Sequence, residues 1–168
     1  FDETIFKTYN FLNDFLAYAV NSKYIDQTIA DEVFTNLKAD NAPAVIDELT
    51  RVGLADKADL IASKLHDSYI YEDSDFLKQY PNIFILTTGE PRWQKIKLAK
   101  AGLSQFTITG QDKAKYLNSR LIRSKQGLVF TDNGEQAYQQ IWLVDDKSKV
   151  IESCLNYHDI KPVYIYRE

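Results

Sequence analysis

The hydrophobic pattern of this chain changes its period near residue 80, and the change limits the folds that the chain can adopt. From about residue 10 to residue 80, apolar side chains recur three or four positions apart, which is the spacing of one face of an α-helix. From residue 81 onward, short apolar runs of strand length alternate with helical stretches. A chain of 168 residues therefore combines an all-helical segment with an α/β segment.

Residues 81–168 are predicted to alternate between strand and helix. The apolar run at 83–86 is continuous, which is typical of a parallel strand that is covered on both faces, and a second apolar strand is expected at 141–144. Further strands are expected at 106–109, 127–130 and 163–166, and helices at 91–101, 113–121 and 147–156. The alternation predicts the fold class, which is α/β with a doubly wound, Rossmann-like parallel sheet.

The composition excludes several classes of protein. Hydrophobic residues make up 45% of the chain and charged residues 26%, which is too apolar for a disordered chain. The net charge of −4 argues against a nucleic-acid partner, since such partners usually meet a basic stripe. No apolar run reaches the roughly 18 residues that span a bilayer, so no membrane partner is expected. Cys154 is the single cysteine, which excludes an internal disulfide and favours a cytoplasmic location.

Polar side chains follow the predicted strands at the points where functional groups gather in doubly wound sheets. The residues that follow strand ends are Thr87, Thr88 and Gly89 after 83–86, Lys113 after 106–109, and Asp145 and Asp146 after 141–144. A hydroxyl, an ammonium group and two carboxylates are therefore expected at one edge of the sheet. Asp2, Glu3 and Thr4 place a carboxylate two residues before a hydroxyl, as at a further strand end.

Four motifs in this order resemble those of the haloacid dehalogenase-like (HAD) hydrolase superfamily. That family opens with an apolar strand and Asp-x-Asp-x-Thr, and residues 1–4 match the last four positions. Residues 86–89 (Leu-Thr-Thr-Gly) match the second motif, which is an apolar strand that ends in Thr or Ser. Lys113 at a helix start matches the third motif, and the acidic residues 145–146 after an apolar strand match the fourth.

The resemblance implies a division into two domains and a nucleophile ahead of Phe1. The HAD-like core would consist of residues 1–9 and 81–168, and residues 10–80 would be a type-1 helical cap. The chain would leave and rejoin the core at hinges near 7–10 and 79–82. The family's nucleophilic Asp would immediately precede Phe1, and because the sequence has no Met, we expect the first strand and this Asp to lie outside it.

The implied function is that of a Mg²⁺-dependent phosphatase that acts on a small phosphorylated metabolite through an aspartyl-phosphate. Asp2 would act as acid and base and lend its backbone carbonyl to the metal, and Asp145 and Asp146 would supply carboxylates to it. Thr87 would bind a phosphoryl oxygen, and Lys113 would offset negative charge. The residues implied in phosphate binding are Glu3, Thr4, Thr88 and Gly89.

Several alternatives remain open from the sequence. Lys115 and Lys125 compete with Lys113 for the role of the active-site lysine. Dehalogenation and carbon–phosphorus cleavage share the scaffold, and a non-catalytic regulatory or binding module could keep the fold. His66 and His158 lie far apart without a companion ligand, which favours surface or packing roles. The substrate and the oligomeric state are not indicated by any motif.

Overall fold

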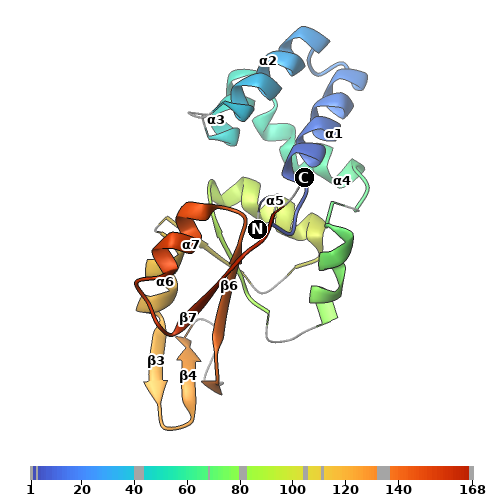
Figure 1. The fold of residues 1–168 in the computed structure, drawn as a ribbon. Coiled ribbons are helices and arrows are strands. Elements are labelled where there is room, and N and C mark those ends of the chain that lie inside the picture. Colours follow the sequence, from blue (N-terminus) through green and yellow to red (C-terminus); the bar gives the residue numbers. More distant parts are fainter. Residues whose placement is uncertain are drawn as a thin grey trace. The chain divides into compact units, whose positions relative to one another are not determined.

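The computed structural model is a mixed α/β protein whose contacts divide it into two compact units (Figure 1). It describes residue 2 and residues 4–39, 44–67, 69–79, 83–103, 106–110, 112–131 and 137–166, without the side chains of residues 76 and 78. The α/β unit comprises Phe1–Ile5, Gln79–Thr88 and Gln105–Glu168. The helical unit comprises Phe6–Lys78 and Gly89–Ser104, so it also takes in a helix that the motif-based division assigns to the core.

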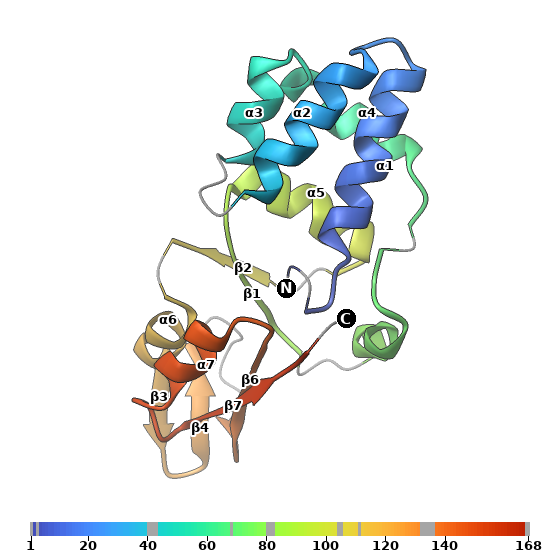
Figure 2. The same ribbon diagram turned by 45° about the horizontal axis from the view of Figure 1, so that its top comes forward.

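Five α-helices build the helical unit, and they are α1 (Thr8–Asn21), α2 (Gln27–Lys38), α3 (Val45–Arg51), α4 (Ala58–Lys64) and α5 (Pro91–Ala101). Helix α1 packs against α2 and α4, while α5 packs against α3 and α4 (Figure 2). Two 3₁₀ turns, η1 (Ala55–Lys57) and η2 (Glu72–Gln79), complete the predicted helical region. Local chemistry sets the ends of α5, because Glu90 accepts bonds from the N–H groups of Arg92 and Trp93, and Gly102 ends the helix at φ 67°.

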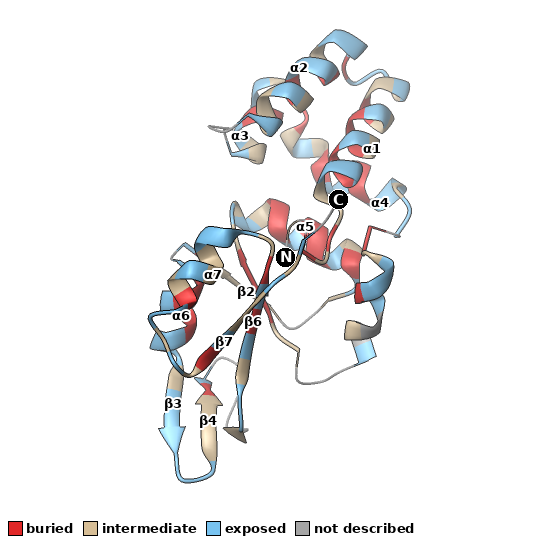
Figure 3. Cartoon of the chain, viewed as in Figure 1, coloured by how far each residue is buried: buried red, intermediate tan, exposed pale blue. Residues whose placement is uncertain are grey.

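The core of the helical unit is a cluster of aromatic rings from α1, α5 and the segments that flank the helices. The ring of Phe11 is fully buried, and its centroid lies 5.5 Å from Phe6, 6.3 Å from Phe15, 5.1 Å from Tyr69 and 5.3 Å from Trp93. Such centroid distances are those of favourable edge-to-face and tilted pairs. The same helices carry much of the buried surface in Figure 3.

The chain enters and leaves the helices of this unit along paired segments. Phe6 and Ile70 form an antiparallel β-bridge, and the backbone N–H of Lys7 donates to the carbonyl oxygen of Tyr69 at 2.7 Å. The two segments are therefore held side by side at the base of α1.

The α/β unit contains two parallel strand pairs and one antiparallel sheet. Strand β1 (Ile85–Thr88) pairs with β2 (Phe106–Thr109), and β6 (Ile141–Asp145) pairs with β7 (Ile160–Tyr164), both in parallel. The antiparallel sheet has the order β3 (Leu121–Ser124), β4 (Gly127–Phe130), β5 (Ala137–Tyr138). Within the described ranges these sheets are separate, so a single doubly wound sheet is not shown.

Helices α6 (Lys113–Ser119) and α7 (Ser148–Cys154) lie side by side, and both contribute to the core of the α/β unit (Figure 1). The core cluster consists of Leu86, Ala114, Leu117, Phe130, Leu143, Cys154 and Ile160. Strand β6 alternates as a half-covered strand does, because Leu143 and Asp145 are buried whereas Trp142 and Val144 are 59% and 43% exposed. In the structure, β6 is therefore buried mainly on one face.

Several element boundaries differ from the sequence prediction. Strand β1 runs to Thr88 rather than ending at residue 86, and β7 begins at Ile160 rather than at residue 163. The helix predicted over 113–121 ends at Ser119, because Leu121 pairs with Phe130 in the β3–β4 hairpin. Pairing with a partner strand overrides the local helical pattern there.

No helix in the described part of the chain is both long enough and apolar enough to cross a membrane.

Candidate functional site

The most deeply buried charge pair of the α/β unit joins the start of α6 to the end of β6. The ammonium nitrogen of Lys113 donates to Oδ2 of Asp145 at 2.7 Å. The two side chains are 9% and 1% exposed. Buried charges are tolerated only when they are paired, so this ion pair satisfies two groups that would otherwise be strongly destabilising.

The second oxygen of Asp145 holds the turn that follows β6. The backbone N–H of Lys147 donates to Oδ1 of Asp145 at 3.0 Å, directly before α7 begins at Ser148. One buried carboxylate thus joins the end of β6, the first residue of α6 and the approach to α7. Asp145 is the last residue of β6, so the strand extends one residue further than the sequence predicts.

The neighbouring carboxylate, that of Asp146, contacts the N-terminal segment. The buried hydroxyl of Thr4 donates to Oδ1 of Asp146 at 2.6 Å, although the two residues are 142 positions apart in the sequence. The contact joins the first predicted motif (residues 1–4) to the fourth (residues 145–146). It also occupies Thr4 with a carboxylate, a contact that the sequence analysis did not anticipate.

Thr87 and Thr88 lie inside β1 rather than beyond its end. Thr87 is buried, and its hydroxyl makes a long 3.4 Å bond to the carbonyl oxygen of Thr88. The next residue, Gly89, has φ 126°, a conformation that L side chains rarely adopt. The backbone conformation therefore favours glycine, whereas a Cβ atom would meet only the flexible end of the Gln94 side chain, with Nε2 at 2.7 Å.

One hydrophobic cluster positions three of the predicted site residues. Leu86, Ala114 and Leu143 are members of the core cluster of the α/β unit. Thr87 directly follows the first of them, and Lys113 directly precedes the second. Asp145 lies two residues beyond Leu143, on the same face of its strand.

Among the three candidate lysines, the structure distinguishes Lys113. Lys113 is buried and ion-paired, whereas Lys115 and Lys125 are exposed. Lys115 points away from the core within α6, and Lys125 lies in the turn of the β3–β4 hairpin.

The proposed metal ligands are only partly assembled. Asp2 is half-buried and forms an isolated β-bridge, while Glu3 lies outside the described residues. In the part of the chain that the structure describes, no three acidic, histidine or cysteine side chains converge on a possible metal position. Asp145 and Asp146 are nevertheless adjacent hard-oxygen donors, and Mg²⁺ is often held through only one or two carboxylates plus water. The donor types of these two residues suit Mg²⁺, although both oxygens of Asp145 already accept hydrogen bonds.

Cys154 and the histidines lie apart from this ion pair. Cys154 is buried in the core cluster, and burial raises the pKa of its thiol, with smaller contributions from the charges of Asp112 and Asp145. His66 stacks on Tyr69 at 4.3 Å and lies 3.3 Å from Asp14, within the helical unit. His158 is exposed.

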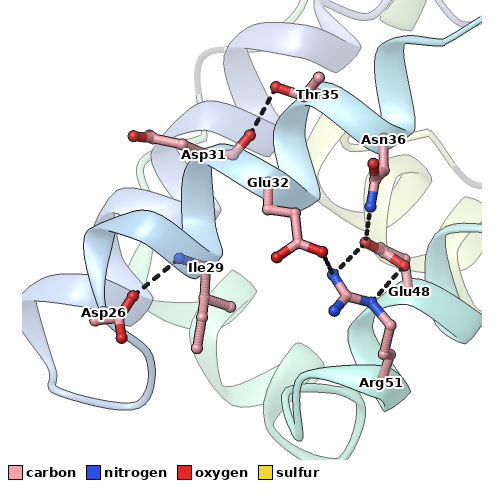
Figure 4. Close-up of polar contacts among 8 residues, drawn as sticks. All are labelled: Asp26, Ile29, Asp31, Glu32, Thr35, Asn36, Glu48 and Arg51. Atoms are coloured by element: carbon pink, nitrogen blue, oxygen red, sulfur yellow. Dashed lines mark hydrogen bonds and ion pairs between the residues drawn. The ribbon is translucent and has the colours of Figure 1, made fainter.

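A second polar network ties α2 to α3 in the helical unit (Figure 4). The nearly buried carboxylate of Glu48 accepts bonds from Arg51 at 2.7 and 3.0 Å and from Asn36 at 2.8 Å. The hydrogen bonds from Arg51 lower the pKa of Glu48 more than burial raises it. All of its partners are local to two neighbouring helices, so we interpret this network as structural.

Sequence reasoning missed two residues that border the Lys113–Asp145 pair. The carboxylate of Asp112 caps α6 by accepting a hydrogen bond from the backbone N–H of Lys115 at Oδ1. The hydroxyl of Ser153 in α7 donates to the same oxygen atom at 2.8 Å. An Asp directly before a helix start is a recognisable N-cap signal, but nothing local indicates that Ser153 contacts it.

Comparisons of the chain with protein-family models, with curated proteins and with solved structures found no match.

Proposed function

We propose that the chain is part of a Mg²⁺-dependent phosphatase of the HAD-like type, and that it acts on a small phosphorylated metabolite. The observation that carries the proposal is the joining of three distant segments at one strand end. The Lys113–Asp145 ion pair and the Thr4–Asp146 hydrogen bond bring together residues of the first, third and fourth predicted motifs. A buried ion pair is costly to keep and is weak evidence for stability, so a chemical role is a reason to retain it.

The chain's own residues would divide the work of phosphoryl transfer among them. Lys113 would offset charge on the phosphoryl oxygens, and the Thr87 hydroxyl would exchange its long intrachain bond for one to such an oxygen. The carboxyl of Asp2 would protonate the leaving alcohol and then accept a proton from the attacking water. Thr4 would hold Asp146 in place. An Asp preceding Phe1 would be the nucleophile and form the aspartyl-phosphate.

Asp145 and Asp146 would hold the metal, together with the backbone carbonyl of Asp2. When bound, Mg²⁺ would supply positive charge near the phosphoryl oxygens. The implied setting is the cytoplasm, because the sequence has a single cysteine.

The doubly wound sheet is the matching proposal for the fold. Among the described residues, β1 pairs only with β2 and β6 only with β7. A strand that precedes Phe1 and lies between β1 and β6 would join the two pairs into one parallel sheet. Two-stranded pairs alone are marginally stable in water, which supports a joining strand. Backbone amides of β1 and β6 should then exchange more slowly in the full-length natural protein than in a chain that begins at Phe1, and equal exchange would contradict the joined sheet.

The decisive experiment is turnover of p-nitrophenyl phosphate with Mg²⁺ by the full-length natural protein. Asp145→Asn and Asp146→Asn should each lower turnover by about 100-fold, the loss that removal of one electrostatic group typically causes. Asp159→Asn is the matched control, because Asp159 is an acid of the same unit that pairs with Arg123 at 2.6 Å. Equal turnover in all three variants would disprove the metal site, and a residue other than Asp before Phe1 would disprove the mechanism.

A non-catalytic binding module is the second candidate function. Its supporting observation is that both oxygens of Asp145 already accept hydrogen bonds, from Lys113 and from the N–H of Lys147. Such a module would show no turnover under any metal condition and would bind a phosphorylated ligand without changing it.

A further inference from the structure

At the start of α6, one side-chain oxygen accepts two hydrogen bonds. Oδ1 of Asp112 accepts a bond from the backbone N–H of Lys115 at 2.8 Å, which is the N-cap of the helix. The same atom accepts a bond from the hydroxyl of Ser153 at 2.8 Å. The first contact orders the start of α6, and the second ties it to α7.

These contacts continue into the Lys113–Asp145 ion pair. Lys113 directly follows Asp112 and is the first residue of α6. Asp145 also accepts a bond from the N–H of Lys147, which precedes α7. The groups therefore form a closed circuit from Asp145 through Lys113 and Asp112 to Ser153, and back along α7 to Lys147.

The two helices of the circuit also share one hydrophobic core. Ala114 and Leu117 of α6 and Cys154 of α7 belong to the core cluster with Leu143. Ser153 is therefore adjacent in sequence to a core residue, and its position relative to α6 is set by packing.

We propose that Asp112 and Ser153 are positioning residues that hold the Lys113 ammonium group against Asp145. A seven-residue helix is too short to keep its own first turn in place, so its start depends on the cap and on the contact with α7. The importance of Lys113 rests on the proposed function, but the positioning itself does not.

The test is acylation of the lysine amines of the 168-residue chain with acetic anhydride. Peptide mapping by mass spectrometry then measures how fast each lysine reacts. Lys115 is the internal reference, since it lies in the same helix and is exposed. In the unchanged chain, Lys113 should react far more slowly than Lys115. Asp112→Ala should raise the Lys113-to-Lys115 ratio about fivefold, the factor that corresponds to losing a typical helix cap. Asp112→Asn keeps an acceptor oxygen and should restore most of the protection.

Two further variants separate positioning from general loss of stability. Ser153→Ala removes the bond to α7 but leaves the N-cap, and it should raise the same ratio by about twofold to fivefold. Asp26→Ala removes the matching N-cap of α2, where Asp26 accepts from the N–H of Ile29 at 2.9 Å, and should leave the ratio unchanged. If Asp112→Ala does not fold, Ser153→Ala decides the question.

The outcomes distinguish this inference from the proposed function. An unchanged ratio in both Ser153→Ala and Asp112→Ala would overturn the positioning role, whatever the turnover. A raised ratio in a full-length protein that lacks phosphatase turnover would support the positioning role and count against the proposed function.

Discussion

The helical unit and the α/β unit differ in how deeply the ion pairs compared here are buried. In the helical unit, the pairs Arg92–Asp59 and Lys100–Asp67 each have at least one partner that is two-thirds exposed or more, and the core is built from aromatic rings. In the α/β unit, the Lys113–Asp145 pair is buried beside the core cluster. Rings stabilise through buried area at little desolvation cost, whereas a buried ion pair must offset the loss of hydration of both charges.

This difference indicates which interactions each unit depends on for its stability. The helical unit also buries charged side chains, such as Glu48 and Lys97, but its ring cluster explains why α1 and α5 stay together. The α/β unit has the buried Lys113–Asp145 ion pair at the end of a strand, where packing of apolar side chains does not require a charged pair. The four predictions below test this contrast, beginning with the largest expected effect.

Phe11→Ala should lower the free energy of unfolding by about 4 kcal/mol, because it removes the ring that contacts four others and leaves a cavity. Urea denaturation followed by circular dichroism measures the loss. Leu60→Ala is the control, since Leu60 is 50% exposed and should cost less than 1 kcal/mol. Equal losses in the two variants would contradict a core centred on Phe11.

Lys113→Met should destabilise the protein by about 3 kcal/mol, because the carboxylate of Asp145 is left buried without its cation. Adding Asp145→Leu in the same chain should recover much of the loss, since no buried charge then remains. Urea denaturation of the single and double variants provides the comparison. If the double variant is less stable than Lys113→Met alone, the loss in Lys113→Met does not come from an unpaired buried carboxylate.

Tyr69→Phe should cost about 1 kcal/mol at neutral pH through loss of the 2.8 Å bond to Asp14. Burial raises the pKa of Tyr69, and the hydrogen bond to Asp14 raises it further. Because the folded state holds this proton more tightly than the unfolded state, the resulting stability is complete below the ordinary tyrosine pKa of about 10 and is lost as the pH rises through the folded value.

The pH dependence of Tm therefore separates Tyr69 from the other tyrosines. Above about pH 10, the Tm of the unchanged chain should fall more steeply than that of Tyr69→Phe. Tyr24→Phe is the matched control, because Tyr24 is 39% exposed. Parallel curves for the unchanged chain and Tyr69→Phe would show that the raised pKa does not contribute to stability.

Arg92→Met should have the smallest effect, about 0.5 kcal/mol, although its 2.7 Å ion pair with Asp59 is as short as the buried pair of the α/β unit. The effect should shrink further in 1 M salt, where exposed charges are screened. Denaturation at low and high salt measures it. A loss close to that of Lys113→Met would erase the contrast between exposed and buried pairs.

Much of the fold could be predicted from local pattern, but the boundaries were less accurate. Periodicity indicates helices and strands because side-chain direction repeats every 3.6 or 2 residues. It located α5 and the strands β2, β4 and β6 closely, and it identified the region that holds α1 and α2 as helical. It missed β3, since Leu121–Ser124 becomes a strand only through pairing with β4. The joined, doubly wound sheet stays a prediction.

The candidate site shows the same limit. An apolar strand that ends in two acids, and a lysine at a helix start, are local features, so Asp145, Asp146 and Lys113 were found as candidates. That Lys113 pairs with Asp145, and Thr4 with Asp146, depends on how segments far apart in the sequence come together. The same holds for the Ser153–Asp112 bond, which joins two helices.

The sequence by itself determined that a helical region and an α/β region share one chain, and which polar residues stand near strand and helix ends. It could do so because burial leaves a repeating mark on neighbouring residues. Only the tertiary structure decided which of the three candidate lysines is buried, which carboxylate it meets, and that α5 packs with the helical unit. Those outcomes depend on contacts between distant segments, which no local period encodes.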